Sequence, residues 1–395
     1  MTDPLGQSQV LPYIAGLSKK GYEFHLISFE KMDRFKLHKK HIRKFCEDND
    51  IKWHPQDYQL NGGLKNTIMQ VRHMRKIALF LHKNHDFKII HCRSYISALV
   101  GLKMKRELGV KFIFDMRGFW ADERIDGNIW SLSSPIYKAI YKYFKQKEIQ
   151  FFAESDYTIS LTENGKNEIL SWKEFTTNPP KIKIIPCCVD LDLFDPSKIT
   201  KIDKQELKQS LEIPEDSLVL GYIGSIGTWY MLSEMLDYFR CLKESNPNAL
   251  FLFVSGENSE MIKSEAKKHG INQDSIRVTS TLHDKVPLHI SIFDHSIFFI
   301  RASFSKKASS PTKQGEIMAM GVPLICNSYI GDTDRIVEKY KSGIVIDKFD
   351  NITYAGNLID PSNFDPLKIS AGAKNYFSLD KGISSYLAVY KSVCE

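Results

Sequence analysis

The sequence lacks the features of a membrane-spanning, secreted or disulfide-stapled protein. No apolar run approaches the roughly 20 residues that a transmembrane helix needs. The first nine residues are polar and turn-like, with no signal-peptide pattern. The seven cysteines are odd in number and scattered, so they form no Cys-x-x-Cys zinc or redox pattern. We therefore expect a protein of the reducing cytoplasm.

Motifs of several enzyme classes are also missing. There is no Walker lysine motif and no recognisable Ser-His-Asp arrangement. His82 and His85 lie three residues apart at the end of a helical stretch, but the sequence offers no credible third metal ligand for them. We therefore predict no metal site.

Length and composition indicate two globular domains. A chain of 395 residues is too long for one ordinary core and suits two domains of roughly 150–200 residues. It is 43% hydrophobic and 26% charged, as soluble globular proteins are. Short β-type runs alternate with helical stretches, which predicts parallel sheets covered on both faces. We expect an α/β protein of two Rossmann-like, doubly wound domains facing a central cleft.

The proline-containing segment Pro186–Pro214 is the expected seam, giving domains at residues 1–190 and 191–377. Residues 378–395 are expected to form a helix that packs back on the first domain. The expected strands are Phe24–Phe29, Ile89–His91, Lys111–Phe114, Tyr157–Leu161, Ile182–Ile185, Val219–Gly224, Leu250–Ser255, Ile276–Thr279, Ser296–Ile300, Pro323–Cys326 and Gly343–Ile346.

The N-terminal segment Asp3–Gln7 has the character of the phosphate turn of a Rossmann unit. It precedes an expected helix, about Gln9–Lys19, but no strand comes before it. The first strand of a doubly wound sheet is central, so its absence would expose buried edges. We expect either that the numbered chain begins about ten residues late or that another segment fills the gap.

The net charge of +7 is concentrated in the first half of the chain. It peaks in Lys31–Lys44, which reads KMDRFKLHKKHIRK. Such a helix is either an ordinary solvated face or a surface that meets nucleic acid or an anionic membrane. We expect peripheral contact with an anionic membrane and no nucleic-acid partner.

The segment Lys306–Gly321, which reads KKASSPTKQGEIMAMG, is the richest in potential chemistry. Ser309 and Ser310 precede a helix; Ser310 is the expected cap and Pro311 the expected first helical residue. Free N–H groups and the helix dipole then form an anion site at a strand's carboxyl end. The alternative is an ordinary capped surface helix.

Three charged residues converge on this helix mouth. Arg301 ends the preceding strand, and Lys313 places a cation in the first turn, where the helix dipole alone disfavours it. A phosphate partner would explain that cation. Glu316 lies one turn deeper and can accept hydrogen bonds from two ribose hydroxyls. At the first strand of the same domain, Gly224 and Ser225 open a glycine turn that lets a backbone approach phosphate.

The segment Phe114–Asp126, which reads FDMRGFWADERID, also follows a strand. Carboxylates hold sugar hydroxyls and an indole stacks on a sugar ring, so this composition suits saccharide binding. The alternative is an Arg–carboxylate network that stabilises a loop. The candidate acceptor-binding residues are Arg93, Arg117, Trp120 and Glu123, and the candidate bases are Asp115 and His91.

Four stretches together resemble the family 4 glycosyltransferases, which have the GT-B fold. They read TDPLGQSQVLPYIAGLSKKGYEFHLISFEK, IIHCRSYISALVGL, FDMRGFWADERID and SSPTKQGEIMAMGVPLI. The nearest likeness is to bacterial enzymes of surface-polysaccharide assembly. The resemblance covers nearly the whole chain, and its motifs are specific only in combination.

The resemblance implies a hexosyl-type transferase that moves a sugar from a nucleotide-diphosphate sugar to a saccharide or polyprenyl-linked acceptor. It implies donor binding by the C-terminal domain, acceptor binding by the N-terminal domain, retention at the anomeric carbon, no metal, and no cofactor besides the nucleotide-sugar co-substrate. A location at the inner membrane face follows from such an acceptor. A nucleotide-sugar 2-epimerase and a catalytically silent nucleotide-sugar-binding module are the alternatives.

The sequence departs from the family pattern at two places. Glu316 matches the second glutamate of the Glu-x7-Glu motif, which holds the ribose, but the first falls on Ala308. The usual Arg and Lys that grip the diphosphate are replaced by Ser225–Thr228. The resemblance therefore assigns the diphosphate to Lys313 and Arg301. Gly6 and Gln7 match the family's N-terminal glycine loop, which closes over the phosphates.

Charge builds on the leaving phosphate during transfer, so N–H groups and Lys313 would lower the barrier. In a retaining front-face scheme the leaving phosphate itself takes the acceptor's proton. If a separate base exists, Asp115 or His91 is expected to serve.

Overall fold

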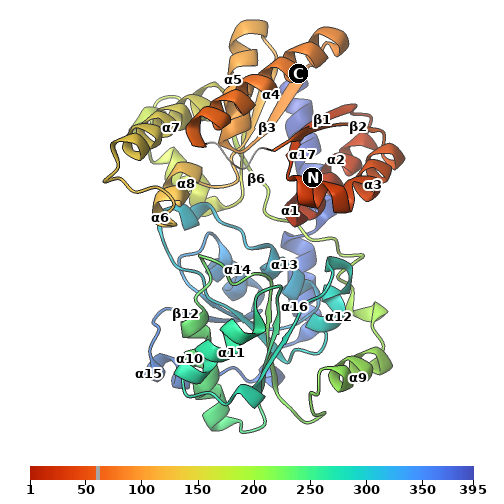
Figure 1. Ribbon diagram of the computed structural model, residues 1–395, viewed down its shortest axis with the longest axis vertical. Helices are drawn as coiled ribbons and strands as arrows, with labels where there is room; N and C mark the ends of the chain where they lie inside the picture. The colour runs from red at the N-terminus through yellow and green to blue at the C-terminus, as the bar shows by residue number, and fades with distance from the viewer. Residues whose placement is uncertain (59–62) are drawn as a thin grey trace. The chain divides into compact units, whose positions relative to one another are not determined.

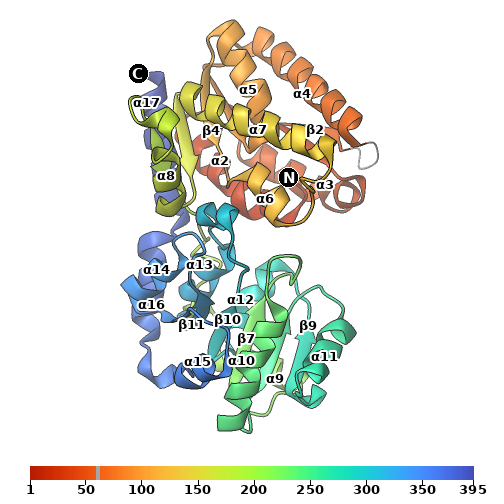
Figure 2. The ribbon, with the colours of Figure 1, turned by 90° about the vertical axis from the view of Figure 1, so that its left-hand side faces the viewer.

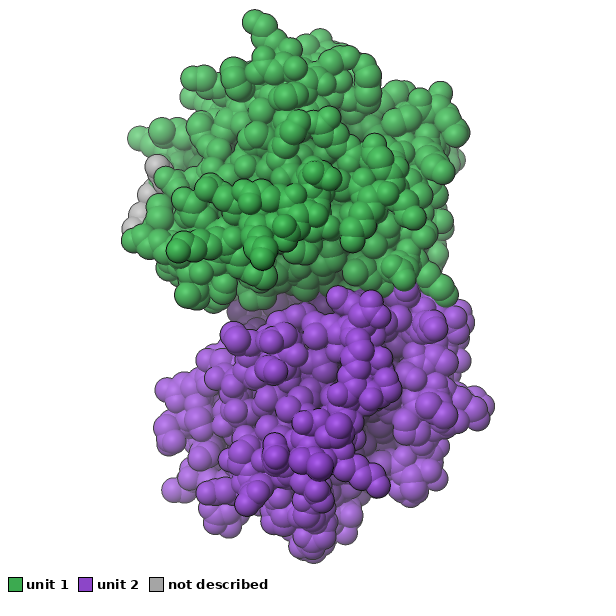
Figure 3. All heavy atoms as spheres, turned by 90° about the vertical axis from the view of Figure 1, so that its right-hand side faces the viewer, with its two compact units in different colours: residues 1–188, 379–395 green, residues 189–378 purple. Residues whose placement is uncertain are grey.

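The computed structural model describes residues 1–58 and 63–395. Contacts divide the chain into two compact units, drawn in two colours in Figure 3. Unit 1 comprises Met1–Cys188 and Leu379–Glu395, and unit 2 comprises Val189–Ser378. The domain boundary expected after residue 190 lies two residues beyond the boundary observed after Cys188.

Unit 2 contains a six-stranded parallel sheet in the order β12-β11-β10-β7-β8-β9. Its strands are β7 (Val219–Ile223), β8 (Leu250–Val254), β9 (Ile276–Thr279), β10 (His295–Phe298), β11 (Leu324–Asn327) and β12 (Gly343–Ile346). This is the doubly wound order in which the chain reverses direction between the first and fourth strands. Here that switch point lies between β7 and β10, which are neighbours in Figure 2.

The strands of unit 2 are short apolar runs because helices cover both faces of the sheet. Every residue of β7 and β8 is buried. Gly221 in β7 is needed for packing, since a Cβ there would lie 2.0 Å from the ring of Phe293. The α-helices of this unit are α9 (Lys201–Ser210), α10 (Leu232–Ser245), α11 (Ser259–Lys268), α12 (Val286–Ile290), α13 (Thr312–Ala319), α14 (Thr333–Tyr340), α15 (Asn351–Gly356) and α16 (Pro366–Tyr376).

Unit 1 contains two parallel sheets, a four-stranded one in the order β3-β4-β5-β6 and a two-stranded one of β1 and β2. The strands are β1 (Phe24–Glu30), β2 (Ile51–Asp57), β3 (Ile89–Arg93), β4 (Lys111–Asp115), β5 (Tyr157–Ser160) and β6 (Ile182–Ile184). The strand β2 is not among the strands expected from the sequence, because it contains Pro55. Proline is tolerated there because β2 pairs only with β1 among the described strands and is an edge.

The expectation of a phosphate turn at Asp3–Gln7 is wrong. The chain forms two helices there, α1 (Pro4–Gln9) and α2 (Leu11–Ser18), with a break at Val10. Each helix has a proline in its first two positions, where the missing N–H costs nothing. A side chain at Gly6 would meet the backbone of Met1 at 2.6 Å, so glycine serves packing at this position.

The C-terminal helix α17 (Leu379–Cys394) belongs to unit 1 and lies beside α2 (Figure 1). Tyr13 of α2 and Tyr386 of α17 meet edge to face, with ring centroids 5.3 Å apart. The other helices of unit 1 are α3 (Met32–Asp48), α4 (Gly63–His85), α5 (Tyr95–Leu108), α6 (Trp120–Asp126), α7 (Pro135–Glu154) and α8 (Glu163–Leu170).

The basic segment of the sequence lies in α3, which buries only Ile42 and Cys46 and leaves its charges near solvent. Across residues 1–58 and 63–395, no helix combines the length and apolar character needed to cross a bilayer.

Candidate active site

The switch point of unit 2 is built by the loop that follows β7. Gly224 begins this loop with a φ of 96°, a left-handed conformation that favours glycine. The loop then folds over the carboxyl end of β10: Met231 donates its backbone N–H to Phe299 at 3.0 Å, and Arg301 donates to Trp229 at 2.9 Å. These bonds fix Trp229 and its neighbour Tyr230 beside the end of β10.

Helix α13 begins at Thr312, so the expected cap at Ser310 and the expected helical Pro311 are wrong. Pro311 itself is the N-cap, in an extended conformation, and no side chain caps the helix. Ser309 instead closes the preceding 3-10 turn by donating its N–H to Lys306 at 3.1 Å. An N-terminus without a side-chain cap leaves its first N–H groups for an anion, so the predicted anion site moves by one to two residues.

Lys313 lies in the first turn of α13 and is buried, with 7% of its surface exposed. Within the described part of the chain, its ammonium has no hydrogen-bond partner. The Nζ atom lies 4.1 Å from the ring centroid of Tyr222 and 3.6 Å from that of Tyr230. A Cβ at Gly224 would lie 3.4 Å from Nζ, so glycine keeps this space open.

Burial is the main reason that the pKa of Lys313 lies well below its ordinary value, and the charge of Glu316 opposes the shift only in part. The faces of two tyrosine rings also favour the cation. Buried charges are normally paired, so an ammonium without a hydrogen-bond partner among the described residues suits an anionic ligand such as a phosphate.

Glu316 is buried one turn further along α13, and His283 lies at its carboxylate. The Nε2 atom of His283 is 3.2 Å from Oε1 of Glu316, and this hydrogen bond raises the pKa of His283. His283 belongs to a 3-10 turn, His283–Lys285, and no motif in the sequence indicates it. The contact engages one carboxylate oxygen and leaves the other for a hydroxyl pair.

Two further cations lie over the ring of Trp229. The guanidinium of Arg301 is 5.1 Å from the centroid, and Nζ of Lys306 is 3.5 Å from it. Arg301 is expected from the sequence but Lys306 is not, since surface lysines are common and only burial distinguishes this one. Ala308 is fully buried in the 3-10 turn Phe304–Ala308. A buried methyl group therefore stands at the position that the resemblance assigns to the first motif glutamate.

In the loop after β7, the backbone oxygen of Ser225 accepts a hydrogen bond of 2.7 Å from the hydroxyl of Tyr222. In unit 1, Gly6 and Gln7 lie in α1, and the Gln7 amide donates to the backbone oxygen of Thr2 at 3.1 Å. The structure therefore places Gly6 and Gln7 in a helix, where the resemblance implied a loop.

Asp115 is the centre of a buried polar cluster at the carboxyl end of β4. Its Oδ2 accepts a hydrogen bond of 3.0 Å from Tyr386 and lies 3.4 Å from Arg93 and 3.7 Å from His91. Its Oδ1 lies 3.8 Å from Arg117. The sequence therefore correctly groups these residues at one sheet edge, while the partner from α17 is 271 residues away in the chain.

Burial alone would raise the pKa of Asp115, but Arg117, His91 and Arg93 together hold it below its ordinary value. Such a carboxylate stays ionised at neutral pH and takes up a proton weakly. His91 directs Nδ1 to the hydroxyl of Tyr390 at 2.7 Å. The geometry thus favours the buried-network interpretation of this segment over a general base.

Trp120 packs inside unit 1 among aromatic rings. Its centroid lies 4.8 Å from Phe144 and 5.2 Å from Trp130, and Arg124 lies over its ring at 5.1 Å. A sugar stacking on this indole would have to displace one of these neighbours. Glu123 lies beside it in the first turn of α6.

Both halves of the chain match known protein families. Residues 8–193 match the model described as Glycosyltransferase Family 4. Residues 203–360 match the model described as Glycosyl transferases group 1.

Two curated relatives are each 23% identical to this chain. One is UDP-Gal:alpha-D-GlcNAc-diphosphoundecaprenol alpha-1,3-galactosyltransferase of Escherichia coli, matched over 62% of this chain and 60% of the relative. The other is D-inositol 3-phosphate glycosyltransferase of Segniliparus rotundus, matched over 48% of this chain and 40% of the relative. The matches thus span only part of these relatives' lengths.

A crystal structure of a glycosyltransferase from Rickettsia africae superposes with a TM-score of 0.74 and 15% identity, covering 99% of this chain and 97% of that one. The two parallel-sheet units and these likenesses define the GT-B fold. The chain belongs to the family 4 glycosyltransferases, and the resemblance found in its motifs is confirmed.

Proposed function

We propose that this chain transfers a hexosyl group from a nucleotide-diphosphate sugar to a saccharide or lipid-linked acceptor. The observation that carries the proposal is Lys313, a buried cation without a hydrogen-bond partner in the described residues, at the start of α13. It lies beside Gly224 at the switch point, where doubly wound sheets bind nucleotides. Family membership supports sugar transfer as the reaction.

The donor is bound by unit 2 in this proposal. The N–H groups of the first turn of α13 and the ammonium of Lys313 hold the diphosphate, and Arg301 supplies a further positive charge. Glu316 accepts hydrogen bonds from the ribose hydroxyls while His283 holds its other oxygen. With Ala308 in place of a carboxylate, recognition of the donor sugar falls to other groups.

The acceptor is bound by unit 1 in this proposal. The carboxyl ends of β3 and β4 present Arg93 and Arg117 around Asp115, and these guanidiniums suit an acceptor that carries phosphate. The E. coli relative acts, by its name, on a GlcNAc linked to diphosphoundecaprenol. An acceptor of that class is consistent with surface-polysaccharide assembly and with peripheral contact of the basic helix α3 with an anionic membrane.

The transfer retains the anomeric configuration and needs no metal at the diphosphate. Cleavage of the anomeric C–O bond leaves negative charge on the diphosphate, which the α13 N–H groups and Lys313 stabilise. The leaving phosphate oxygen takes the proton of the acceptor hydroxyl as the new glycosidic bond forms. A separate base is then unnecessary, in agreement with the weakly basic Asp115.

The test is product analysis with nucleotide sugars and with polyprenyl-diphosphate-linked GlcNAc as acceptor. We expect free nucleoside diphosphate to appear only when the acceptor is present, and an α-linked product from an α-linked donor. Conversion of the nucleotide sugar without acceptor would indicate a 2-epimerase instead. Donor binding without either reaction, across a panel of donors and acceptors, would indicate a silent binding module.

A further inference from the structure

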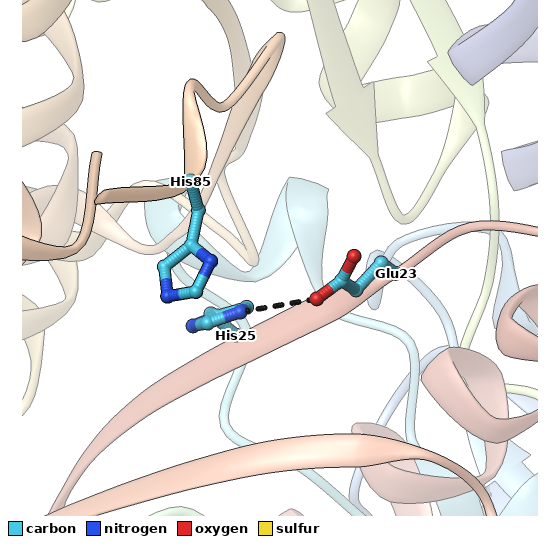
Figure 4. A group of neighbouring side chains, drawn as sticks. All are labelled: Glu23, His25 and His85. Atoms are coloured by element: carbon cyan, nitrogen blue, oxygen red, sulfur yellow. Dashed lines mark hydrogen bonds and ion pairs between the residues drawn. The ribbon is translucent and has the colours of Figure 1, made fainter. Parts of the chain in front are cut away.

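Three potential metal ligands meet in unit 1 at the amino end of β1. Glu23 lies just before the strand, His25 lies within it, and His85 is the last residue of α4. Figure 4 shows the three side chains directed toward one another, with an interaction drawn between His25 and Glu23. Glu23 and His25 are about 60 residues from His85 in the chain, so no local pattern in the sequence indicates them as further ligands.

The distances suit a small divalent cation. One ligand atom from each residue lies within 4.8 Å of the other two. The Nε2 atom of His25 is 3.4 Å from Oε1 of Glu23. Ligands of a tetrahedral zinc ion at about 2.0–2.1 Å are separated by roughly 3.3–3.5 Å. One edge of such a tetrahedron is therefore already in place, and rotation of the exposed His85 side chain closes the rest.

His54 of β2 supports the site from behind. Its Nε2 atom lies 3.1 Å from Nδ1 of His25, so His54 can accept the Nδ1 proton of that ring. This leaves the Nε2 lone pair of His25 for a metal, the arrangement that orients histidine ligands in metal sites.

We propose that Glu23, His25 and His85 bind a divalent transition-metal ion, for which Zn²⁺ fits best, with solvent as the fourth ligand. Two imidazoles and one carboxylate form a ligand set that Zn²⁺ takes in tetrahedral geometry. The ion would tie the end of α4 to the start of β1. The site lies at the amino end of its strand, whereas Asp115 lies at a carboxyl end, so this role is separate from sugar transfer.

Lys52 is the group that opposes the metal. Its ammonium forms an ion pair with Oε1 of Glu23, and the side chains are 53% and 62% exposed. An exposed pair of this kind contributes little to stability, so a metal can displace it. The positive charge nevertheless weakens cation binding. Lys52→Gln is therefore expected to raise the affinity for the metal, whereas loss of a ligand lowers it.

The test is calorimetric titration of the full-length, tag-free protein with Zn²⁺, in a Cys394→Ser background because Cys394 is the exposed thiol. We expect one equivalent to bind, with His85→Gln and Glu23→Gln each weakening binding at least tenfold and Lys52→Gln tightening it several-fold. His41→Gln, an exposed histidine on α3, is the matched control and leaves the affinity unchanged.

A second readout is the visible spectrum of the Co²⁺-loaded protein, which reports tetrahedral coordination. We expect tetrahedral bands in the parent protein and their loss in His85→Gln, while the metal-free melting temperatures of both proteins agree. Failure of the parent to bind Zn²⁺, or an affinity and spectrum unchanged by His85→Gln and Glu23→Gln, would overturn the proposal.

Discussion

The ammonium nitrogen of Lys313 lies 3.6 Å from the centre of the Tyr230 ring, in the buried first turn of α13. The Tyr230 ring is brought there by a loop that bonds back to the strand end at Phe299 and Ile300. The contact therefore joins the two chain segments that follow β7 and β10, the strands that flank the switch point. Its chemistry leads to the first two predictions.

Lys313→Met is expected to stabilise the ligand-free protein. An unsatisfied buried polar group costs about 1–3 kcal/mol, and methionine fills the same space without that cost. The cation–ring contacts offset part of the penalty, so we expect a net gain of about 1 kcal/mol. Denaturant unfolding of wild type, Lys313→Met and the exposed control Lys307→Met measures it. A clear loss of stability in Lys313→Met would contradict the buried-cation account.

Binding of a nucleoside diphosphate is expected to take up a proton. Burial lowers the pKa of Lys313 in the free protein, and an adjacent diphosphate raises it again. Between these two pKa values the complex holds a proton that the free protein lacks, so affinity falls as pH rises through that window. Calorimetry in buffers of different ionisation enthalpy measures the uptake. Lys313→Met should abolish it, and a wild-type protein with no uptake at any pH refutes the mechanism.

Glu316→Gln is expected to separate recognition of ribose from recognition of phosphate. The carboxylate accepts from ribose hydroxyls in our proposal, and a hydrogen bond to a charged group contributes about 1.5–3 kcal/mol. We therefore expect nucleoside diphosphates to bind roughly ten- to hundredfold more weakly, while inorganic pyrophosphate binds as before. Competition titrations on both ligands provide the comparison. Equal losses for the two ligands would place Glu316 elsewhere.

Asp115→Asn is expected to destabilise the protein by about 3 kcal/mol, because it leaves the half-buried Arg93 and Arg117 without their buried counter-charge. Tyr386→Phe removes only one hydrogen bond to the same carboxylate and should cost about 2 kcal/mol. Urea unfolding of the two variants gives both values. If Asp115→Asn unfolds like wild type but loses turnover, Asp115 acts in the chemistry and the network interpretation is wrong.

Much of the fold was predictable because periodicity is local. All eleven apolar runs that the sequence predicts as strands coincide with strands of the structure, and the α/β class with parallel sheets is confirmed. The strand β2 was missed because Pro55 argues against a strand unless its edge position is known. The helix α1 was missed because Pro4 and Gly6 read as turn residues, although proline suits the first turn of a helix.

The site was predictable only where its residues follow one another along the chain. Lys313 and Glu316 share one helix, so spacing places them together. His283 and Tyr386 reach Glu316 and Asp115 from 33 and 271 residues away, which no local pattern reveals. The pairing of His85 with His25 depends on tertiary contact in the same way.

The most direct test of the central claim is calorimetric titration of the wild-type protein and Lys313→Met with a panel of nucleoside diphosphates, with Lys307→Met as the control. The account predicts that at least one nucleoside diphosphate binds wild type and Lys307→Met equally, and binds Lys313→Met at least a hundredfold more weakly. Equal affinity of that ligand for wild type and Lys313→Met would contradict the assignment of the diphosphate site to the start of α13.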